Sequence, residues 1–252
     1  EASKNTSNSL SSSLEKLSSG LKINKASDDA SGLAIADKLR TQVTSIDQGV
    51  ANGNSAVSLL QIADKSMAEQ STILDTIKAK LIQANTDTTS DDGRTAIAGD
   101  IAKLLEQLTN IGEQTNYNGR QLISGSDGAT AASVHTFQVG EKNTDTITTG
   151  TINANTTGLG LGALSTAANA TLTKTIAAAQ QTVVNAAIST LNSYRADIGS
   201  TQNQVESAVR NLMTQSTNLS AAESVIRDVD YAEESANFNK QNIISQAGSY
   251  AI

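Results

Sequence analysis

Residues 39–74 of the chain read LRTQVTSIDQGVANGNSAVSLLQIADKSMAEQSTIL. Apolar side chains recur in this stretch at steps of three, four or seven residues, at Leu39, Val43, Ile46, Val50, Val57, Leu60, Met67 and Leu74. Polar or small residues interrupt the series at Gly53, Asp64 and Ser71. This spacing is typical of a helix that keeps one apolar seam against a partner helix, as in a coiled coil.

The long helix has start and stop signals in the sequence. Ser27, Asp28 and Asp29 offer side-chain oxygens and negative charge to the unpaired amides of a helix start. The polar run NTDT at residues 85–88 breaks the pattern. A helix between these signals would extend about 85 Å at ~1.5 Å per residue, which exceeds the width of a compact domain of this length. The stretch therefore predicts a rod, a shape suited to mechanical or assembly work.

A second apolar seam lies in the C-terminal half of the chain. Helical spacing resumes around Leu172 and Ile176, and its regular part contains Leu191, Tyr194, Ile198, Val205, Val209, Leu212, Leu219, Ala222, Ile226 and Val229. The two seams are natural partners in an antiparallel pair of rods.

A shorter helix and a reversal are predicted after the first rod. The apolar positions of this helix are Ile97, Ile101, Leu104, Leu105, Leu108 and Ile111. Asp91 and Asp92 can cap it, and Gly112 is expected to end it. Its short connection makes it an antiparallel neighbour of the first rod. The dipeptide Asn118-Gly119 tolerates positive φ, so the chain is expected to reverse there.

Residues 124–170 are rich in Gly, Ser, Thr, Ala and Asn. Alternating side chains in residues 134–139 and 145–149, separated by a turn, predict a β-hairpin. The glycines at 158, 160 and 162 predict a flexible loop, and they lack the Lys-Ser/Thr sequence of a phosphate loop. The predicted fold class is mainly α, with long antiparallel coiled-coil rods and a small β-hairpin region at the tip.

The ends of the chain predict two short amphipathic helices. Their apolar side chains are Leu10, Leu14, Leu17 and Leu21 at one end and Phe238, Ile243 and Ile244 at the other. Isolated helices this short are marginal in water, so these side chains are expected to need a partner subunit. A non-closing contact between identical rods produces a helical filament rather than a ring.

The expected organisation has five parts. They are a partial N-terminal helix and joint at 1–26, the first part of the rod domain at 27–123, a variable region at 124–170, a C-terminal rod helix at 171–232 and a partial C-terminal helix at 233–252. Because the chain opens on Glu1 rather than Met, we expect it to be trimmed.

Composition excludes several classes of function. The net charge of −7 argues against sequence-independent binding to nucleic acid, which depends on Lys and Arg neutralising phosphates. No run approaches ~18 consecutive apolar residues, so no membrane span is expected. The absence of cysteine removes disulfides, thiolate nucleophiles and thiolate zinc ligands, and the absence of proline permits very long helices.

Candidate chemical sites are few. His135 is the only histidine, and a structural role is favoured over catalysis or metal binding. It cannot build a His-Glu-X-X-His zinc site alone, and no serine on a strained elbow is indicated for a Ser-His-Asp arrangement. Asp91, Asp92 and Gly93 lack the alternating oxygens of a calcium loop, so helix capping is favoured. No cofactor, metal or enzymatic activity is predicted.

Several motifs, in order along the chain, resemble those of bacterial flagellins. The N-terminal ones are LSSGLKIN at residues 17–24 and DDASGLAIA at 28–36, and the C-terminal ones are NLSAAESVIRDVDYA at 218–232 and ISQAG at 244–248. TNYNG at 115–119 is similar to the family turn, with Tyr117 in place of the usual Phe. The resemblance covers residues 10–123 and 185–250, leaves the middle unmatched, and is highly specific.

The resemblance implies a structural subunit of the bacterial flagellar filament that is secreted and becomes part of the extracellular flagellum. In flagellins, exported monomers polymerise beneath a distal cap, so the implied partners are other flagellin subunits, cap and junction proteins and an export chaperone. The extreme termini pair in the inner tube of the filament in this family, and their expected loss predicts a monomer. The alternatives are a hook–filament junction protein of similar architecture and a secreted enzyme on a flagellin-like frame.

The resemblance also raises the question of innate immune recognition, because many flagellins are bound by Toll-like receptor 5. Strongly recognised flagellins carry a patch similar to Leu-Gln-Arg-Val-Arg-Glu-Leu on the first rod and a Glu on the next helix. Alignment from Leu74 and from the turn at 118–119 places Thr76 at the arginine, Lys80 at the leucine and Gln107 at the glutamate. These substitutions predict weak binding to the receptor, and drift at exposed positions is the alternative explanation for them.

Overall fold

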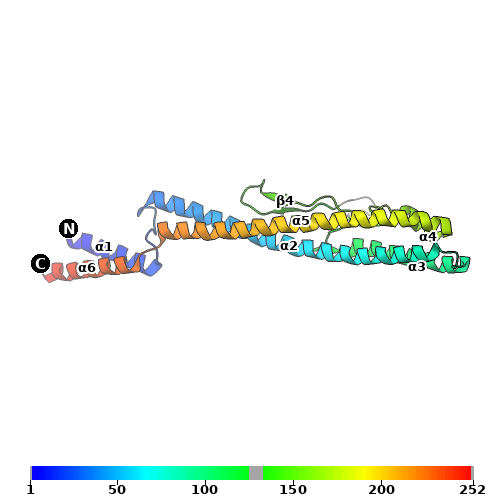
Figure 1. Ribbon diagram of the computed structural model, residues 1–252. Coiled ribbons are helices and arrows are strands. Elements are labelled where there is room, and N and C mark those ends of the chain that lie inside the picture. The colour runs from blue at the N-terminus through cyan, green and yellow to red at the C-terminus, as the bar shows by residue number, and fades with distance from the viewer. Residues whose placement is uncertain (1, 125–132, 251–252) are drawn as a thin grey trace. The chain divides into compact units, whose positions relative to one another are not determined.

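The computed structural model describes residues 2–124 and 133–250 and is mainly helical (Figure 1). Its helices are α1 Ala2–Ser19, α2 Ala30–Ala84, α3 Asp91–Gln114, α4 Gly162–Asn169, α5 Lys174–Arg227 and α6 Tyr231–Tyr250. Its strands are β1 Asn116–Tyr117, β2 Arg120–Gln121, β3 Thr136–Gln138 and β4 Thr146–Thr148. The predicted fold class of long helices with a small hairpin region is confirmed.

The chain forms two compact units. Glu1–Val50 and Arg210–Ile252 make up one, called here the terminal unit, and Ala51–Val209 make up the other, called the central unit. Each unit contains a part of α2 and a part of α5.

In the central unit, α2 and α5 run antiparallel. Asp64 Oδ1 of α2 accepts a hydrogen bond from Arg195 Nε of α5 at 2.9 Å. Further along, Asp87 Oδ1 pairs with Lys174 Nζ at 2.7 Å. Residue numbers rise on one side of the pair as they fall on the other, so the predicted antiparallel arrangement is confirmed here. Asp64, which interrupts the apolar pattern in the sequence, supplies an ion pair between the helices.

The buried positions of α2 in the central unit recur at alternating steps of three and four residues, with Leu59 as an additional buried neighbour. They are Gly53, Ala56, Leu60, Ala63, Met67, Gln70, Leu74, Ile77, Leu81 and Ala84. This is the heptad pattern of a coiled coil. The predicted Leu60, Met67 and Leu74 belong to it, whereas Val57 is half-buried. Small or polar residues fill the positions that the apolar pattern skips.

The facing positions of α5 follow the same spacing. Buried residues there are Ala177, Gln180, Val184, Ala187, Leu191, Ile198, Thr201, Val205 and Val209. The close approach of the two helices is clearest at Gly53, where an added Cβ would lie 2.3 Å from Val209 Cγ2. Real Cβ atoms do not approach other atoms so closely, so the glycine sets the spacing of α2 and α5 at this point.

Gln70 joins three segments of the central unit. Its side chain is fully buried, and its Nε2 donates to the carbonyl oxygens of Leu108 in α3 at 3.0 Å and of Ala154 at 2.6 Å. Gly112 lies beside this junction, since an added Cβ would be 3.1 Å from the oxygen of Ala154. α3 continues past Gly112 to Gln114, so the predicted stop at Gly112 was wrong. The glycine serves close packing instead.

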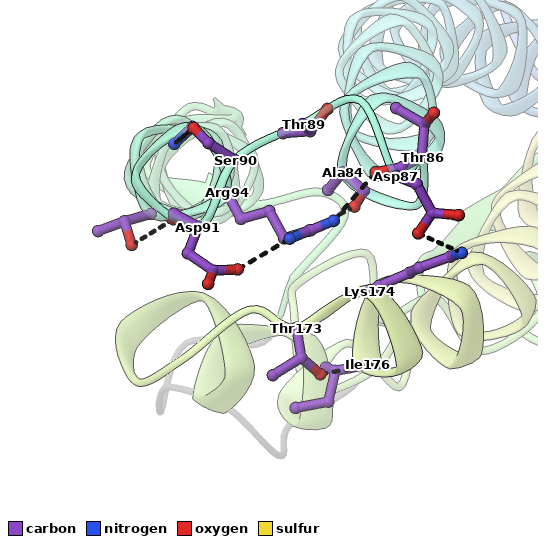
Figure 2. Close-up of polar contacts among 12 residues, drawn as sticks. Ala84, Thr86, Asp87, Thr89, Ser90, Asp91, Arg94, Thr173, Lys174 and Ile176 are labelled. Carbon is purple, nitrogen blue, oxygen red and sulfur yellow. Dashed lines mark hydrogen bonds and ion pairs between the residues drawn. The ribbon is translucent and has the colours of Figure 1, made fainter.

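The turn between α2 and α3 is held by side chains that satisfy helix-end groups (Figure 2). Arg94 Nε donates to the oxygen of Ala84 at 3.0 Å, and its Nη2 donates to the oxygen of Thr86 at 3.0 Å. Its Nη1 pairs with Asp91 Oδ1 at 2.8 Å. A guanidinium thus covers carbonyls at the C-terminal end of α2, where a positive charge is favourable.

The start of α3 differs in one residue from the prediction. Ser90 is its N-cap, and Ser90 Oγ accepts a hydrogen bond from the Gly93 amide at 3.1 Å. Asp91 and Asp92 occupy the first turn, where negative charge is favourable. The predicted antiparallel packing on α2 is confirmed by the bond between Lys80 Nζ and Asp100 Oδ2 at 2.7 Å.

Two antiparallel hairpins follow α3. β1 pairs with β2 around Asn118 and Gly119, whose φ values of 51° and 77° confirm the predicted reversal. β3 pairs with β4, with Phe137 opposite Ile147, as the alternation predicted. Asn52 Nδ2 of α2 donates to the oxygen of Gln138 at 3.1 Å. The second hairpin therefore lies beside the residue-52 region of α2 and not beside the turn at 85–90. Its predicted position at the tip of the rods was wrong, because the sequence alternation predicts a hairpin but not the part of the helix on which it packs.

Residues 152–172 pack onto the helices and are not an open loop. The apolar side chains of Ile152, Leu159, Leu161, Leu164 and Leu172 are all buried. Asn155 Oδ1 accepts from the Gly158 amide at 2.7 Å, and α4 begins at Gly162. The predicted flexible loop was wrong because leucines between the glycines are drawn into the core. Part of the predicted variable region, residues 125–132, lies outside the described residues.

Candidate assembly surfaces

The terminal unit holds the two end helices side by side. α1 and α6 are packed on one another (Figure 1). Leu10, Leu17, Leu21 and Phe238 are half-buried, whereas Leu14, Ile243 and Ile244 stay exposed. The packing of α1 on α6 therefore covers only a part of the two predicted apolar stripes.

The segment after α1 and the segment before α6 are paired through their backbones. The Lys22 amide donates to the oxygen of Arg227 at 2.6 Å, and the Val229 amide donates to the oxygen of Gly20 at 3.0 Å. Gly20 has a φ of 76°, and an added Cβ there would lie 2.8 Å from Tyr231 Oη. A side chain at position 20 would therefore be strained and crowded.

Carboxylates order the joint before α2. Asp29 Oδ1 accepts from the amides of Ser31 and Gly32 at 3.0 and 2.9 Å, which confirms a helix-capping role. Asp28 Oδ2 accepts from the amides of Asn24 and Lys25 at 3.1 and 2.9 Å. These backbone hydrogen bonds, from Lys25 first, lower the pKa of Asp28 below its ordinary value.

In the terminal unit, α2 and α5 again run antiparallel, with Ser216 Oγ donating to Asp47 Oδ1 at 2.7 Å. Of the proposed rod-core residues there, Ile46 is buried. The others are half-buried, namely Leu39, Val43, Val50, Leu212, Leu219 and Ile226. The seam is thus less completely covered in this unit than in the central unit.

Exposed large apolar side chains are concentrated in the terminal unit. Those in the terminal unit are Leu14, Ile35, Met213, Val225, Tyr231, Ile243 and Ile244, and those in the longer central unit are Ile62, Ile82, Tyr117 and Val134. Val225 is 85% exposed and Ile243 is 67% exposed. Exposed apolar side chains gathered on one part of a protein mark a surface that another molecule can cover.

The three residues of the candidate receptor patch lie on the exposed side of the central unit. Thr76 and Lys80 are on α2, and Gln107 is on the neighbouring α3. Thr76 and Gln107 are exposed. Lys80 Nζ is bound to Asp100 Oδ2, and this hydrogen bond and the positive charge lower the pKa of Asp100. The lysine cation is therefore directed to α3.

A groove of about 270 Å³ lies between the hairpins and α2. Its floor and walls come from Ala56 and Leu59 of α2, Tyr117 and Arg120 of the first hairpin, and Phe137 of β3. No ion pair to Arg120 is found within residues 2–124 and 133–250. This groove was not foreseen from the sequence because it needs three segments that are distant along the chain.

His135 is a buried structural residue beside this groove. One ring nitrogen, Nε2, is 3.0 Å from the oxygen of Leu122, and its backbone amide donates to Thr149 Oγ1 at 3.0 Å. Burial lowers the pKa of His135 below 6.5, the hydrogen bond to Leu122 opposes that shift, and the charge of Arg120 adds to it. The surroundings of the ring thus favour its neutral form.

We expect the central unit to lose stability in mild acid through His135. Its folded pKa lies below its unfolded value, so its contribution is fully present above pH 6.5 and falls as the unfolded chain takes up a proton below that pH. Urea unfolding at about pH 7.5 and about pH 5.5 should show a smaller pH effect in a His135→Gln variant. An identical pH dependence in both proteins would contradict this assignment.

Metal binding and membrane insertion are two further functions on which the described residues bear. Within residues 2–124 and 133–250 no group of three or more His, Cys, Asp or Glu side chains is arranged to hold a metal ion. In the same ranges no helix combines the length and apolar character needed to cross a membrane.

Comparison with known proteins places these features in a family. The chain matches the family model of the bacterial flagellin N-terminal helical region over residues 1–128 and that of the C-terminal helical region over residues 181–252. Flagellin of Bacillus subtilis (strain 168) is 36% identical over 277 residues, covering 98% of this chain and 91% of that protein. Flagellin B of Helicobacter pylori (strain J99) is 51% identical over 138 residues, which cover 55% of this chain and 26% of that protein.

Solved structures show the same fold. The crystal structure of Bacillus cereus flagellin aligns with a TM-score of 0.53 at 24% identity, over 69% of this chain and 94% of that one. A putative flagellar hook-associated protein from Vibrio parahaemolyticus aligns with a TM-score of 0.65 at 12% identity, over 79% of this chain and 99% of that one. The family matches at both ends, and the Bacillus subtilis relative along nearly the whole length, show that the chain belongs to the bacterial flagellin family.

Proposed function

We propose that this structural subunit of the bacterial flagellar filament polymerises through the exposed apolar side chains of its terminal unit. The observation that carries the proposal is their concentration there, with Leu14, Ile243 and Ile244 exposed on α1 and α6. Burial of such side chains is worth about 1.5–3 kcal/mol each. A contact that joins different surfaces of identical subunits continues into a helical filament when its rotation does not close into a ring.

The implied partners follow from this role. Other flagellin subunits are the main partner, and cap proteins, junction proteins and an export chaperone would contact the same chain before or during assembly. These partners are the ones expected for a subunit of an extracellular flagellum that serves motility. Members of this family have a structural role. The alternative is a hook–filament junction protein, which would occupy only the base of a filament, whereas a filament subunit makes up most of its length.

We expect Ile243→Asp, introduced into the intact flagellin gene, to reduce filament formation at least tenfold. A charge at this exposed position leaves the fold intact but opposes burial against a neighbour. Ile82→Asp, at a 54% exposed position of the central unit, is the matched control and should leave filaments unchanged. The measurement is filament length and number in electron micrographs of a host without its own flagellin.

Normal filaments from the Ile243→Asp subunit would remove the proposed role of α6. Loss of filaments in both variants would show that assembly is as sensitive to a charge in the central unit as to one in the terminal unit, which would contradict the proposal. Circular dichroism of both monomers separates failure to assemble from failure to fold. Short stubs in place of long filaments, formed from the same intact gene without a substitution, would favour the junction protein.

A second proposal concerns Toll-like receptor 5, to which we expect weak binding. In place of the arginine fork of strongly recognised flagellins, Thr76 presents a hydroxyl that donates to its own helix at Thr72. Lys80 is engaged with Asp100, and Gln107 is uncharged. Loss of a central interface arginine commonly costs about 2 kcal/mol.

A triple variant with Thr76→Arg, Lys80→Leu and Gln107→Glu should therefore signal more strongly than the parent chain. The measurement is a receptor-reporter assay with purified monomer over a range of concentrations. Since Lys80→Leu also removes the bond to Asp100, thermal unfolding of the variant is the control for stability. Equal and strong signalling by both proteins would refute weak recognition.

A further inference from the structure

The sequence contains two Asn-Gly dipeptides, Asn52-Gly53 and Asn118-Gly119. This dipeptide is the one most prone to spontaneous deamidation, because glycine leaves its backbone nitrogen unshielded. The nitrogen of the glycine attacks Cγ of the asparagine, so the reaction needs a free amide nitrogen, a free side chain and a backbone that can rotate. The structure places the two dipeptides in opposite surroundings.

Asn118-Gly119 forms the two-residue turn of the β1–β2 hairpin. Tyr117 pairs with Arg120, and the two turn residues have φ values of 51° and 77°. Both are exposed, and the space around Gly119 is open, since an added Cβ would meet no atom within 4 Å. In the part of the chain that the structure describes, the Gly119 amide and the Asn118 side chain have no hydrogen-bond partner. Nucleophile and electrophile are thus both free.

Asn52-Gly53 is held within α2. Asn52 Nδ2 donates to the oxygen of Gln138 at 3.1 Å, which fixes the side chain. Gly53 is buried against Val209, and its amide lies inside a helix, where it donates to the carbonyl four residues before it. Ring closure here would require breaking the helix and opening its contact with α5.

We propose that Asn118 is a site of spontaneous deamidation in the folded protein, whereas Asn52 is protected. Hydroxide takes the proton of the Gly119 nitrogen, which then forms a bond to Asn118 Cγ. The bond from Cγ to the side-chain nitrogen breaks, and that nitrogen takes a proton from water and leaves as ammonia. Water then opens the cyclic imide at either carbonyl. The products are aspartate and isoaspartate at position 118, and no oxidant or reductant takes part.

Both products change the surface next to the groove. An aspartate adds a negative charge two residues from Arg120, which lines the groove with Tyr117. An isoaspartate routes the main chain through the side chain and adds one backbone atom. The two-residue turn then no longer has the geometry that the pairing of Tyr117 with Arg120 requires. The modification would thus distinguish aged subunits from newly made ones.

The test incubates the native monomer at alkaline pH and follows both dipeptides by peptide mass spectrometry. The readouts are the mass change when an amide becomes an acid and isoaspartyl labelling of the same peptides. The chain in concentrated urea is the reference, since both dipeptides should react there at similar rates. In the native protein we expect Asn118 to convert at least tenfold faster than Asn52. An Asn118→Gln variant should lose only the signal at 118.

Two results would overturn the proposal. One is native conversion of Asn118 as slow as that of Asn52, which would show that the hairpin turn protects it. The other is equal and fast conversion of both, which would show that α2 gives no protection. Conversion of Asn118 in the native state with Asn52 reacting only in urea supports it.

Discussion

A Leu60→Asp variant is expected to lose about 3 kcal/mol or more of unfolding free energy. The side chain of Leu60 is fully buried in the seam of α2. A carboxylate there would be removed from water, and the seam positions one turn away, Ala56 and Ala63, offer no cation. Loss of the leucine methyl groups adds a packing penalty.

The matched control is Ile62→Asp, two residues further along the same helix. Ile62 is 40% exposed, so the same charge would remain hydrated and should change stability by less than about 1 kcal/mol. Thermal and urea unfolding, followed by circular dichroism, measure both variants. Equal stability of the Leu60→Asp variant and the parent chain would refute the coiled-coil core.

Gly53→Leu is expected to have the second largest effect, a loss of about 2–3 kcal/mol. Already the first added carbon would lie 2.3 Å from Val209 Cγ2 and 3.7 Å from Val205 Cγ1. The valine side chains cannot bend away as a long flexible chain would. α2 and α5 would have to separate at this point, which exposes neighbouring core residues.

Gly99→Leu is the control for the change in helix propensity. Gly99 is exposed on α3, and an added Cβ there meets no atom within 4 Å. Leucine is a better helix former than glycine, so this variant should gain up to about 1 kcal/mol. The expected result is a lower urea midpoint than that of the parent chain for Gly53→Leu and a higher one for Gly99→Leu. A stabilised Gly53→Leu variant would mean that the two helices are not in close contact there.

Long helices and their pairing could be predicted from the sequence because apolar side chains report helical periodicity directly. The same rule missed Gly53, Ala56, Ala63 and Gln70, because it counts large apolar residues and treats small or polar ones as gaps. In a tight helix pair, small residues are needed where the backbones approach. The apolar periodicity therefore predicted the helix but not the positions at which it packs most closely on α5.

The surfaces were harder to predict. A pattern on one helix cannot tell whether another helix covers it, so Leu10 and Leu17 could not be separated from the exposed Leu14. Arg94 was not singled out, because its partners are backbone carbonyls, which no side-chain pattern reveals. The exposed Val225 and Met213 lie outside the apolar seam of α5, so the spacing of the seam residues gave no indication of them.

The backbone pairing of Leu21 with Asp228 has a consequence for the order of folding. It closes a loop of about 200 residues, and forming such a contact from an open chain is slow because most of the chain's freedom must be lost first. Turns such as those at 85–90 and 118–119 join residues that are already neighbours along the chain. We therefore expect the central unit to form early and the joined ends to close last and open first. A subunit that is still being delivered would keep its two ends apart until the whole chain has arrived.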